Sequence, residues 1–328
     1  MKLWARAITT VLALLLAASV AGAKPAQVHV GVVLKALDNP FFVAMYEGVR
    51  AEAGRRGVDA SVRAANGYAD LAGQAAHARA LVAGKKDCYV VNPITSTNLI
   101  ASLRGVRRPI VNIDSPIDVA AASRAGVHIS SFIGTNDVQV GSAAAAKMVA
   151  LLPKGGTVGV VGGTADSVNS NHRMSGFERG VRATRVRVVA RVDADYDRAK
   201  ADLAAERIIH LHPHLAGFFA VNDEMALGVA DAVRAAGMTG SVMIIGVDGI
   251  LDALDAVRNG SITATVSQYP FVMGQMAVEA CVAAAHGARL PARVDAPIAV
   301  VSKSNVGRAT ASFPRPFRGY ADPFKRLR

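Results

Sequence analysis

Residues 28–57, VHVGVVLKALDNPFFVAMYEGVRAEAGRRG, decide the expected fold. The stretch opens with an apolar run, Val28–Val33, that is typical of a buried β-strand. A helical segment follows from Pro40 to Gly54, and Arg55-Arg56-Gly57 closes it. A buried strand followed by an amphipathic helix is the repeating unit of a parallel sheet that is covered on both faces.

The same alternation of strand and helix continues along the chain and begins afresh near residue 128. Further strands are expected at 60–63, 88–91, 109–113, 128–134, 157–161, 187–192, 217–221, 242–247, 263–268 and near 298–301. Helices are expected at 69–83, 96–104, 138–152, 171–183, 197–210, 224–236 and 271–285. The rhythm predicts an α/β protein with two similar, doubly wound parallel-sheet lobes.

The length of the chain also favours two lobes, because more than 300 residues exceed what one core usually serves. We expect lobe one at 26–132 plus 268–298. Lobe two is expected at 136–264, with 299–305 added if the last strand crosses back to it. Three crossings, near 132–136, 263–268 and 296–301, would then form a hinge about which the lobes rotate as rigid bodies.

The two ends of the chain differ from this pattern. Residues 1–23 carry Lys2 and Arg6 ahead of the apolar run 8–20 and end in Ala21-Gly22-Ala23, which predicts a secretory signal peptide cut after Ala23. A retained membrane anchor is the alternative, but a run of about 13 residues is short of the ~20 that a spanning helix needs. Prolines and scattered basic residues predict that 306–328 form an exposed, flexible, basic tail.

Charge and cysteine content narrow the function further. The net charge of +12 includes +2 in residues 1–23 and +4 in residues 312–328, and no block of like charge lies between them. Nucleic-acid binding is therefore not expected. Cys88 and Cys281 lie in apolar contexts, and nothing in their spacing shows that they meet, so two buried free thiols are favoured over a disulfide.

Polar and aromatic side chains follow several of the predicted strands. In open parallel sheets, ligands bind beyond the carboxyl ends of the strands. Aromatic faces, planar amides, carboxylates and a guanidinium suit a sugar, whose C–H faces pack on rings and whose hydroxyls both donate and accept. The candidate ligand-binding residues are Asn39, Phe41, Phe42, Asp114, Ser115, Arg173, Tyr196, Asn222, Asp248 and Gln268.

Three motifs, in order, carry a family resemblance: Asn39-Pro40-Phe41-Phe42, Asn222-Asp223-Glu224-Met225-Ala226-Leu227-Gly228 and Gly246-Val247-Asp248-Gly249. At these residues the chain resembles the ribose-type sugar-binding proteins, which are type I periplasmic binding proteins and the substrate-binding components of ABC transporters. The resemblance covers roughly 28–305. It implies a periplasmic, monomeric protein without cofactor that captures a monosaccharide or polyol and delivers it to an ABC permease.

The resemblance also implies roles for the candidate residues. Asn39 would hydrogen-bond a hydroxyl, and Phe41 and Phe42 would lie against the sugar face. Asp114 and Asp248 would accept hydrogen bonds from hydroxyls, one from each lobe. The remaining roles are two charge-assisted donors from Arg173, an aromatic wall at Tyr196, and a polar ring completed by Asn222 and Gln268.

Two departures from the family pattern widen the choice of substrate. Ser115 follows Asp114 where ribose binders usually carry an arginine, and Val247 stands where an aromatic residue is usual. The guanidinium donors of that arginine and the ring of that aromatic residue are therefore missing. A roomier pocket would admit a hexose, a furanose, or a linear or cyclic polyol besides ribose.

Several alternatives compete with sugar transport. His210, His212 and His214 could suggest a metal enzyme, and Asp114 with Asp248 an acid–base pair, but no cofactor or nucleophile motif accompanies them. A calcium loop at residues 193–204 lacks the required glycine and glutamate. A transcription regulator would need a helix-turn-helix segment ahead of the lobes. A subunit that presents its ligand to a chemoreceptor or sensor kinase, and a binder of another small polar ligand, remain open.

Overall fold

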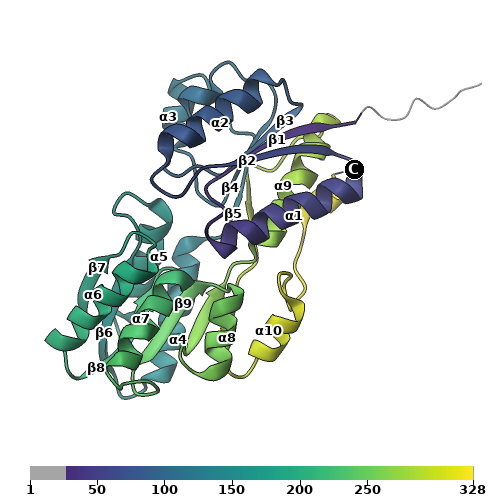
Figure 1. The fold of residues 1–328 in the computed structure, drawn as a ribbon. Coiled ribbons are helices and arrows are strands. Elements are labelled where there is room, and N and C mark those ends of the chain that lie inside the picture. Colours follow the sequence, from purple (N-terminus) through teal and green to yellow (C-terminus); the bar gives the residue numbers. More distant parts are fainter. Residues whose placement is uncertain (1–26, 328) are drawn as a thin grey trace, which may run out of the picture.

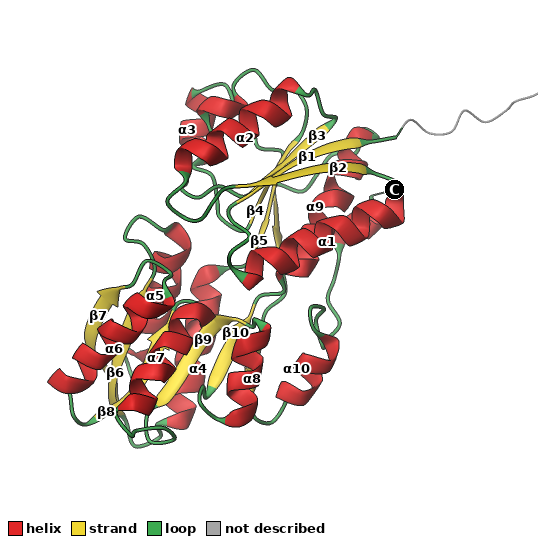
Figure 2. Ribbon diagram, viewed as in Figure 1, coloured by secondary structure: helices red, strands yellow, loops and turns green. Residues whose placement is uncertain are grey.

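A computed structural model describes residues 27–327. Figure 1 and Figure 2 show two lobes, each built on one sheet with helices packed against it. The predicted α/β fold with two doubly wound lobes is confirmed, with one antiparallel strand as the exception. The predicted signal peptide and its cut after Ala23 lie outside the described residues.

Sheet A forms the core of lobe one and contains six parallel strands in the order β11-β5-β4-β3-β1-β2. Neighbouring residues of β1 serve different faces, since Val32 packs in the cluster with α1 and α9 and Val33 packs in the cluster with α2. The strands are β1 (His29–Leu34), β2 (Asp59–Ala64), β3 (Cys88–Val91), β4 (Ile110–Ile113), β5 (Ser131–Gly134) and β11 (Arg293–Asp295). The helices are α1 (Pro40–Arg56), α2 (Leu71–Ala83), the 3₁₀ turn η1 (Ala101–Leu103), α3 (Val119–Arg124) and α9 (Pro270–Ala285).

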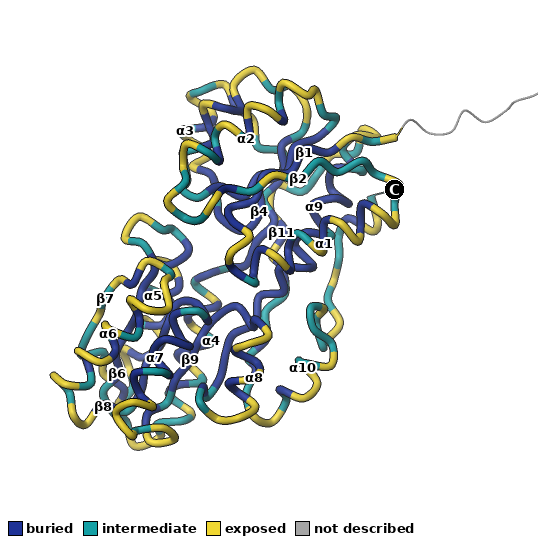
Figure 3. Tube along the Cα trace, in the orientation of Figure 1, coloured by how far each residue is buried: buried dark blue, intermediate teal, exposed yellow. Residues whose placement is uncertain are grey.

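Sheet B forms the core of lobe two in the order β12-β10-β9-β8-β6-β7, and β12 runs antiparallel to β10. In both lobes the central strands are buried, whereas the edge strands β2, β7 and β11 are partly exposed (Figure 3). The strands are β6 (Gly156–Gly162), β7 (Val186–Asp193), β8 (Leu215–Ala220), β9 (Met243–Asp248), β10 (Ala264–Ser267) and β12 (Ala299–Ser302). The helices are α4 (Asp137–Leu151), α5 (Val168–Val181), α6 (Arg198–Leu211), α7 (Asp223–Ala235), α8 (Leu251–Asn259) and α10 (Val306–Ser312).

The chain passes between the two sheets three times. It leaves sheet A after β5, returns from sheet B after β10, and leaves sheet A again between β11 and β12. Side chains tie these segments together: Thr135 donates to Gln268 Oε1 at 2.6 Å, and Arg293 Nη2 donates to the Thr135 carbonyl at 3.2 Å. We propose that these three segments are the hinge and that they set the limits of the lobes.

Some predicted elements differ from the structure. The helix expected at 96–104 is reduced to η1, and neither α3 nor α8 was predicted. Within residues 27–327 no helix is both long and apolar enough to cross a bilayer.

The expectation of an irregular, exposed tail is wrong. Residues 306–312 form α10, and a second 3₁₀ turn, η2 (Pro323–Arg326), packs against α9. Phe324 is only 1% exposed and belongs to the main hydrophobic cluster. Prolines and basic residues predicted a solvated segment, but the aromatic residues between them supply the apolar surface that anchors it.

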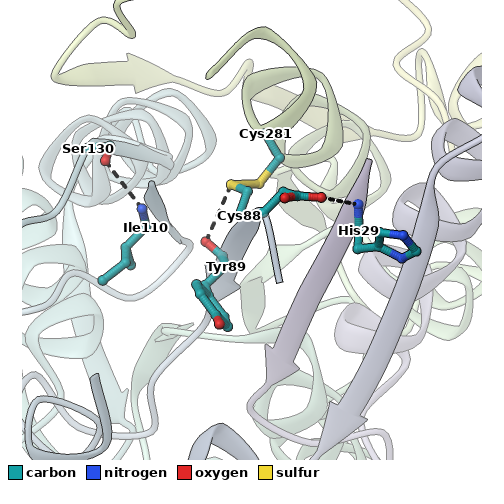
Figure 4. Close-up of a disulfide and its surroundings, with 7 residues drawn as sticks. His29, Cys88, Tyr89, Ile110, Ser130 and Cys281 are labelled. Atoms are coloured by element: carbon teal, nitrogen blue, oxygen red, sulfur yellow. Dashed lines mark hydrogen bonds between the residues drawn. A yellow bond between two sulfur atoms is a disulfide. The ribbon is translucent and has the colours of Figure 1, made fainter. Parts of the chain in front are cut away.

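The expectation of two free thiols is also wrong, because Cys88 and Cys281 form a disulfide (Figure 4). The bond joins β3 to α9, and the Cα atoms of the two residues lie 5.5 Å apart. Both residues are fully buried. Sequence spacing gave no sign of the contact, because the two cysteines are 193 positions apart and lobe two lies between them.

Candidate functional site

A partly open cavity lies where the two lobes face each other. Both lobes contribute to its lining, and nine of the ten predicted ligand-binding residues belong to it. These are Asn39, Phe41, Phe42, Asp114, Ser115, Arg173, Tyr196, Asn222 and Asp248. Three further lining residues, Lys35, Tyr68 and Asn169, were not predicted. Gln268 does not line the cavity.

Two carboxylates enter the cavity at equivalent places in the two lobes. Asp114 directly follows β4 and Asp248 ends β9, so both lie at the carboxyl edge of their sheets. Both backbones adopt positive φ angles, 59° at Asp114 and 125° at Asp248. Such angles are costly for residues other than glycine, and they persist where the surrounding structure enforces them. Both residues line the cavity.

Arg173 is held rigidly between the two carboxylate-bearing regions. Its side chain is only 5% exposed. Its guanidinium donates to Asp137 Oδ1 at 2.7 Å, to the Val221 carbonyl at 2.8 Å and to Gln268 Oε1 at 3.0 Å. Burial opposes the charge, but Asp137 and then Asp248 outweigh it and raise the pKa of Arg173. The arginine therefore stays charged while presenting one edge to the cavity.

Gln268 lies behind the cavity wall and connects it to the hinge. Its Nε2 donates to Asp248 Oδ1 at 2.6 Å, and its Oε1 accepts from Arg173 and Thr135. The side chain is fully buried. Its position fits an orienting role for Asp248 and Arg173.

Asp248 is a buried carboxyl whose pKa lies near neutral pH. Burial, opposed by Arg173 and Gln268, raises the pKa of Asp248 to about 7. Asp223 lies beneath it and accepts hydrogen bonds from the backbone amides of Gly249 and Ile250 at 2.6 and 3.1 Å. Burial and the charge of Asp248 raise the pKa of Asp223 well above its usual value.

Lys35 supplies a cation that the sequence analysis missed. Its Nζ donates to Ser115 Oγ at 2.5 Å and lies 3.7 Å from Asp114 Oδ2. The same ammonium group lies 5.5 Å from the centre of the Phe42 ring and 5.7 Å from that of Tyr68. Burial, opposed by Asp114, lowers the pKa of Lys35. A lysine directly after a buried strand was the available signal.

Lys35 therefore supplies the positive charge that Ser115 does not. The arginine that ribose binders usually carry at that position is absent, but the lysine places a positive charge beside the same carboxylate. A single ammonium group donates as a point charge and lacks the planar fork of a guanidinium.

The two lobes contact each other around the cavity. The rings of Tyr68, from lobe one, and Tyr196, from lobe two, are stacked with centroids 5.1 Å apart. Asn169 of lobe two donates to the Asp114 carbonyl at 3.1 Å. The structure therefore describes a closed arrangement. Tyr196, predicted as an aromatic wall, forms that wall together with Tyr68.

Two asparagines combine helix capping with a place in the cavity. Asn39 Oδ1 accepts from Phe41 N at 2.8 Å at the start of α1, and Asn222 Oδ1 accepts from Met225 N at 3.0 Å at the start of α7. Their amide nitrogens remain for other partners. Asn39 Nδ2 has a long contact, 3.4 Å, to the Tyr68 hydroxyl. Asn222 is 2% exposed, and its Nδ2 has no partner among residues 27–327.

An unpartnered buried donor is costly, and Asn222 Nδ2 belongs to the cavity lining, where a water or a bound molecule can supply its acceptor. Two carboxylates, two cations and amide groups in a small cavity can hold several hydroxyls at once. Phe41, Phe42 and the tyrosine pair provide apolar faces. Across residues 27–327, no group of three or more His, Cys, Asp and Glu side chains is placed to hold a metal ion.

Comparisons with known proteins agree with this geometry. Residues 30–289 match the family model described as "Periplasmic binding protein domain". The D-allose-binding periplasmic protein of Escherichia coli (strain K12) is 35% identical over 248 residues, which cover 74% of this chain and 80% of that protein. The ribose import binding protein RbsB of Bacillus subtilis (strain 168) is 30% identical over 272 residues, 82% of this chain and 85% of that protein.

Among solved structures, a periplasmic solute-binding protein of an ABC transporter from Actinobacillus succinogenes 130z, with bound D-allose, superposes with a TM-score of 0.82. The two proteins are 25% identical, and the alignment covers 86% of this chain and 99% of the other.

Proposed function

Since the chain belongs to the periplasmic binding protein domain family, we propose that it captures a neutral aldohexose, with D-allose as the first candidate, between its two lobes. In outline it is the solute-binding protein of an ABC-type sugar importer. It binds a sugar or polyol, delivers it to a membrane permease and catalyses no reaction.

The observation that carries the proposal is the balanced polar lining of the cavity. Lys35 lies beside Asp114, and Arg173 lies beside Asp137 and Asp248, so each cation of the lining already has a carboxyl partner. A charged ligand would leave one of these groups uncompensated in a buried site, which is costly. A neutral polyol meets each group with a hydroxyl, because a hydroxyl both donates and accepts.

Each lining residue takes a role that its geometry supports. Asp114 and Asp248 accept from hydroxyls, and Lys35, Arg173 and Asn222 donate to oxygens. The aromatic groups Phe41, Phe42, Tyr68 and Tyr196 pack against C–H faces of the ring. Asn39, Ser115 and Asn169 contribute further polar contacts at the wall, and Gln268 orients Asp248.

A hexose is favoured over ribose because Ser115 stands where ribose binders usually carry an arginine. Lys35 reaches Ser115 and Asp114 from the end of strand β1, and Ser115 is smaller than the arginine that ribose binders usually carry. The relative that binds D-allose by name also has the higher identity of the two described above.

The protein is proposed to act in the periplasm. Its relatives carry periplasmic or import names, and residues 1–23 have the pattern of a signal peptide. We propose cleavage after Ala23 and a mature, monomeric chain that starts at Lys24. Mass spectrometry of the exported protein would give the N-terminal residue, and a different first residue would overturn the cleavage site.

A thermal-shift screen tests the ligand. The mature protein, stripped of ligand by unfolding and refolding, is screened against D-allose, D-ribose, other hexoses and pentoses, and inositols. A ligand that binds the folded state raises the melting temperature by mass action. D-allose should give the largest shift, and Asp248→Asn should lose it. A larger shift with another sugar would overturn the D-allose assignment, and no shift with any neutral sugar would overturn the sugar-binding proposal.

A further inference from the structure

The C-terminal strap, residues 313–327, runs beside the hinge from lobe two to lobe one. In Figure 1 it is the yellow segment that runs from α10 toward the C-terminal end of α1 and the start of β2. It belongs to neither sheet and follows the third crossing in the sequence. It therefore connects the lobes a fourth time.

The strap begins on lobe two. Helix α10 precedes it and packs against α8 and β12. Val306 and Ala309 are the buried residues of this helix. The strap therefore starts from a helix that is packed onto lobe two.

The first residues of the strap line a space between the two lobes. Phe313, Pro314 and Arg315 line a second, mostly apolar cavity. Phe41 of lobe one and Leu254 of lobe two lie on its other walls. The strap residues thus contact a space whose walls come from both lobes.

The middle also contacts the hinge and the start of α9. The Arg315 guanidinium lies 5.0 Å from the centre of the Phe271 ring. The Phe317 ring is 6.4 Å from that of Tyr269, at an interplanar angle of 67°. Tyr269 directly follows Gln268 and has a positive φ of 55°. The strap therefore packs on the residue next to the one that orients Asp248.

The end of the strap is anchored in lobe one. Phe324 is buried in the hydrophobic cluster, and Asp322 Oδ1 caps η2 by accepting from Phe324 N at 3.0 Å. Asp322 lies against Glu279 of α9, which in turn accepts from Arg56 Nη2 at 3.2 Å. Burying this aromatic side chain stabilises the attachment.

We propose that the C-terminal strap stabilises the closed arrangement of the lobes and thereby raises ligand affinity from outside the ligand site. Rotation of the lobes apart would separate the Phe41 wall from the Leu254 wall and expose Phe313 between them. Contacts that exist only in the closed form shift the equilibrium toward it. Residues 313–322 can extend over roughly 33–36 Å, so the strap permits opening and acts through its contacts.

The two cavities share a wall, which links the strap to the ligand. Phe41 and Asp248 line both of them. Packing on the strap side of this wall therefore bears on two residues that the proposed function assigns to the ligand. The inference adds to the proposed function, and its test includes a measurement that needs no ligand.

Three variants of the mature chain separate the possibilities. One is truncated after Ser312; one carries Phe313→Ala with Phe317→Ala, which leaves the Phe324 anchor in place; the control carries Arg326→Ala, an exposed strap residue. Calorimetry gives Kd for D-allose, or for the sugar that the screen selects. Small-angle scattering of the ligand-free proteins gives the radius of gyration.

We expect the truncated and double variants to bind about three- to thirty-fold more weakly than the control, which corresponds to a loss of about 0.7–2 kcal/mol. Their ligand-free radius of gyration should increase as the open form gains population. A double variant that melts normally and keeps the control's Kd and radius of gyration would overturn the proposal. If the truncated chain fails to fold, the double variant decides. If no sugar binds, the scattering comparison decides.

Discussion

The rings of Tyr68 and Tyr196 are stacked across the cleft, with centroids 5.1 Å apart and planes at 16°. Tyr68 belongs to the loop between β2 and α2 of lobe one, and Tyr196 to the loop between β7 and α6 of lobe two. The Tyr196 hydroxyl is 2.5 Å from Ser167 Oγ, and burial, opposed by Arg173, raises the pKa of Tyr196 to about 12. The pair forms a neutral aromatic lid over the ligand cavity.

Removing one ring should weaken binding without unfolding the protein. Tyr68→Ala removes the stacking contact, which is worth about 0.5–1.5 kcal/mol beyond its buried area, so Kd should rise about three- to tenfold or more. Calorimetry measures the change. Tyr68→Phe is the control, since it keeps the ring and should stay within about threefold of the wild type. Equal losses in both variants would assign the effect to the hydroxyl.

Arg173→Ala should reduce stability as well as binding. The substitution leaves Asp137 buried without its partner, and breaking a buried ion pair from one side typically costs about 3–5 kcal/mol. Chemical denaturation measures this cost. Adding Asp137→Asn to Arg173→Ala should recover part of the stability but none of the binding. An Arg173→Ala protein with wild-type stability would show that water compensates Asp137.

Binding should weaken in acid because of Asp248. Its pKa is raised to about 7 by burial, and hydroxyl donors favour the ionised carboxylate. As pH falls from 8 to 6 the ligand must displace a proton, so Kd should rise by up to about tenfold per pH unit below 7. Calorimetry in buffers of different ionisation enthalpy should detect proton release on binding. A Kd that stays constant from pH 8 to 6 would contradict this assignment.

The same residue should affect the stability of the ligand-free protein with the opposite sign. A carboxyl whose pKa is raised in the folded state stabilises fully below its unfolded pKa, and this contribution is lost as pH rises through about 7. Asp248→Asn should therefore stabilise the ligand-free protein at pH 8. Melting temperatures of both proteins from pH 5 to 9 test this, and parallel curves would contradict it.

Glu279 should give the strap its own pH dependence. Burial, together with Asp322 and Glu52, raises the pKa of Glu279 to about 8, while Arg56 opposes the shift. Arg55, Lys325 and Tyr320 also face this cluster. The protonated form stabilises the docked strap, so stability should fall as pH rises from about 5 to 8. Glu279→Gln should flatten that part of the curve, and a profile identical to the wild type would contradict the assignment.

Loss of the disulfide should lower stability substantially. Removing a native disulfide typically costs about 2–5 kcal/mol. Cys88→Ser with Cys281→Ser should therefore lower the denaturation midpoint, and reductant should lower it for the wild type only. Sugar affinity should change little, because the bond joins β3 to α9 away from the cavity lining. Equal midpoints of oxidised and reduced wild-type protein would overturn this.

The sequence located those cavity residues that also end a strand or cap a helix. Asn39 and Asn222 cap helices after strands, and Asp114 and Asp248 end strands, so strand–helix rhythm located all four. Lys35 escaped because a lysine one residue past a strand is ordinarily solvated. Its burial depends on Ser115 and Tyr68, which are remote in the sequence.

Residues that depend on the approach of the two lobes were the hardest to predict. Tyr68 lies in a loop without a motif, and its place follows from contact with Tyr196. Gln268 was expected in the lining, but hydrogen bonds to Asp248, Arg173 and Thr135 fill its polar groups behind the wall. The strap's docking surface on α9 likewise exists only in three dimensions.

The disulfide also has a consequence for the order in which the molecule can be assembled. Cys88 is synthesised early, whereas Cys281 follows nearly all of lobe two, so lobe one lacks α9 and β11 until late in translation. Lobe two, by contrast, has five of its six strands by residue 267. The cross-link can therefore close only after the inserted lobe has been made, and its formation marks the arrival of the last structural pieces of the first.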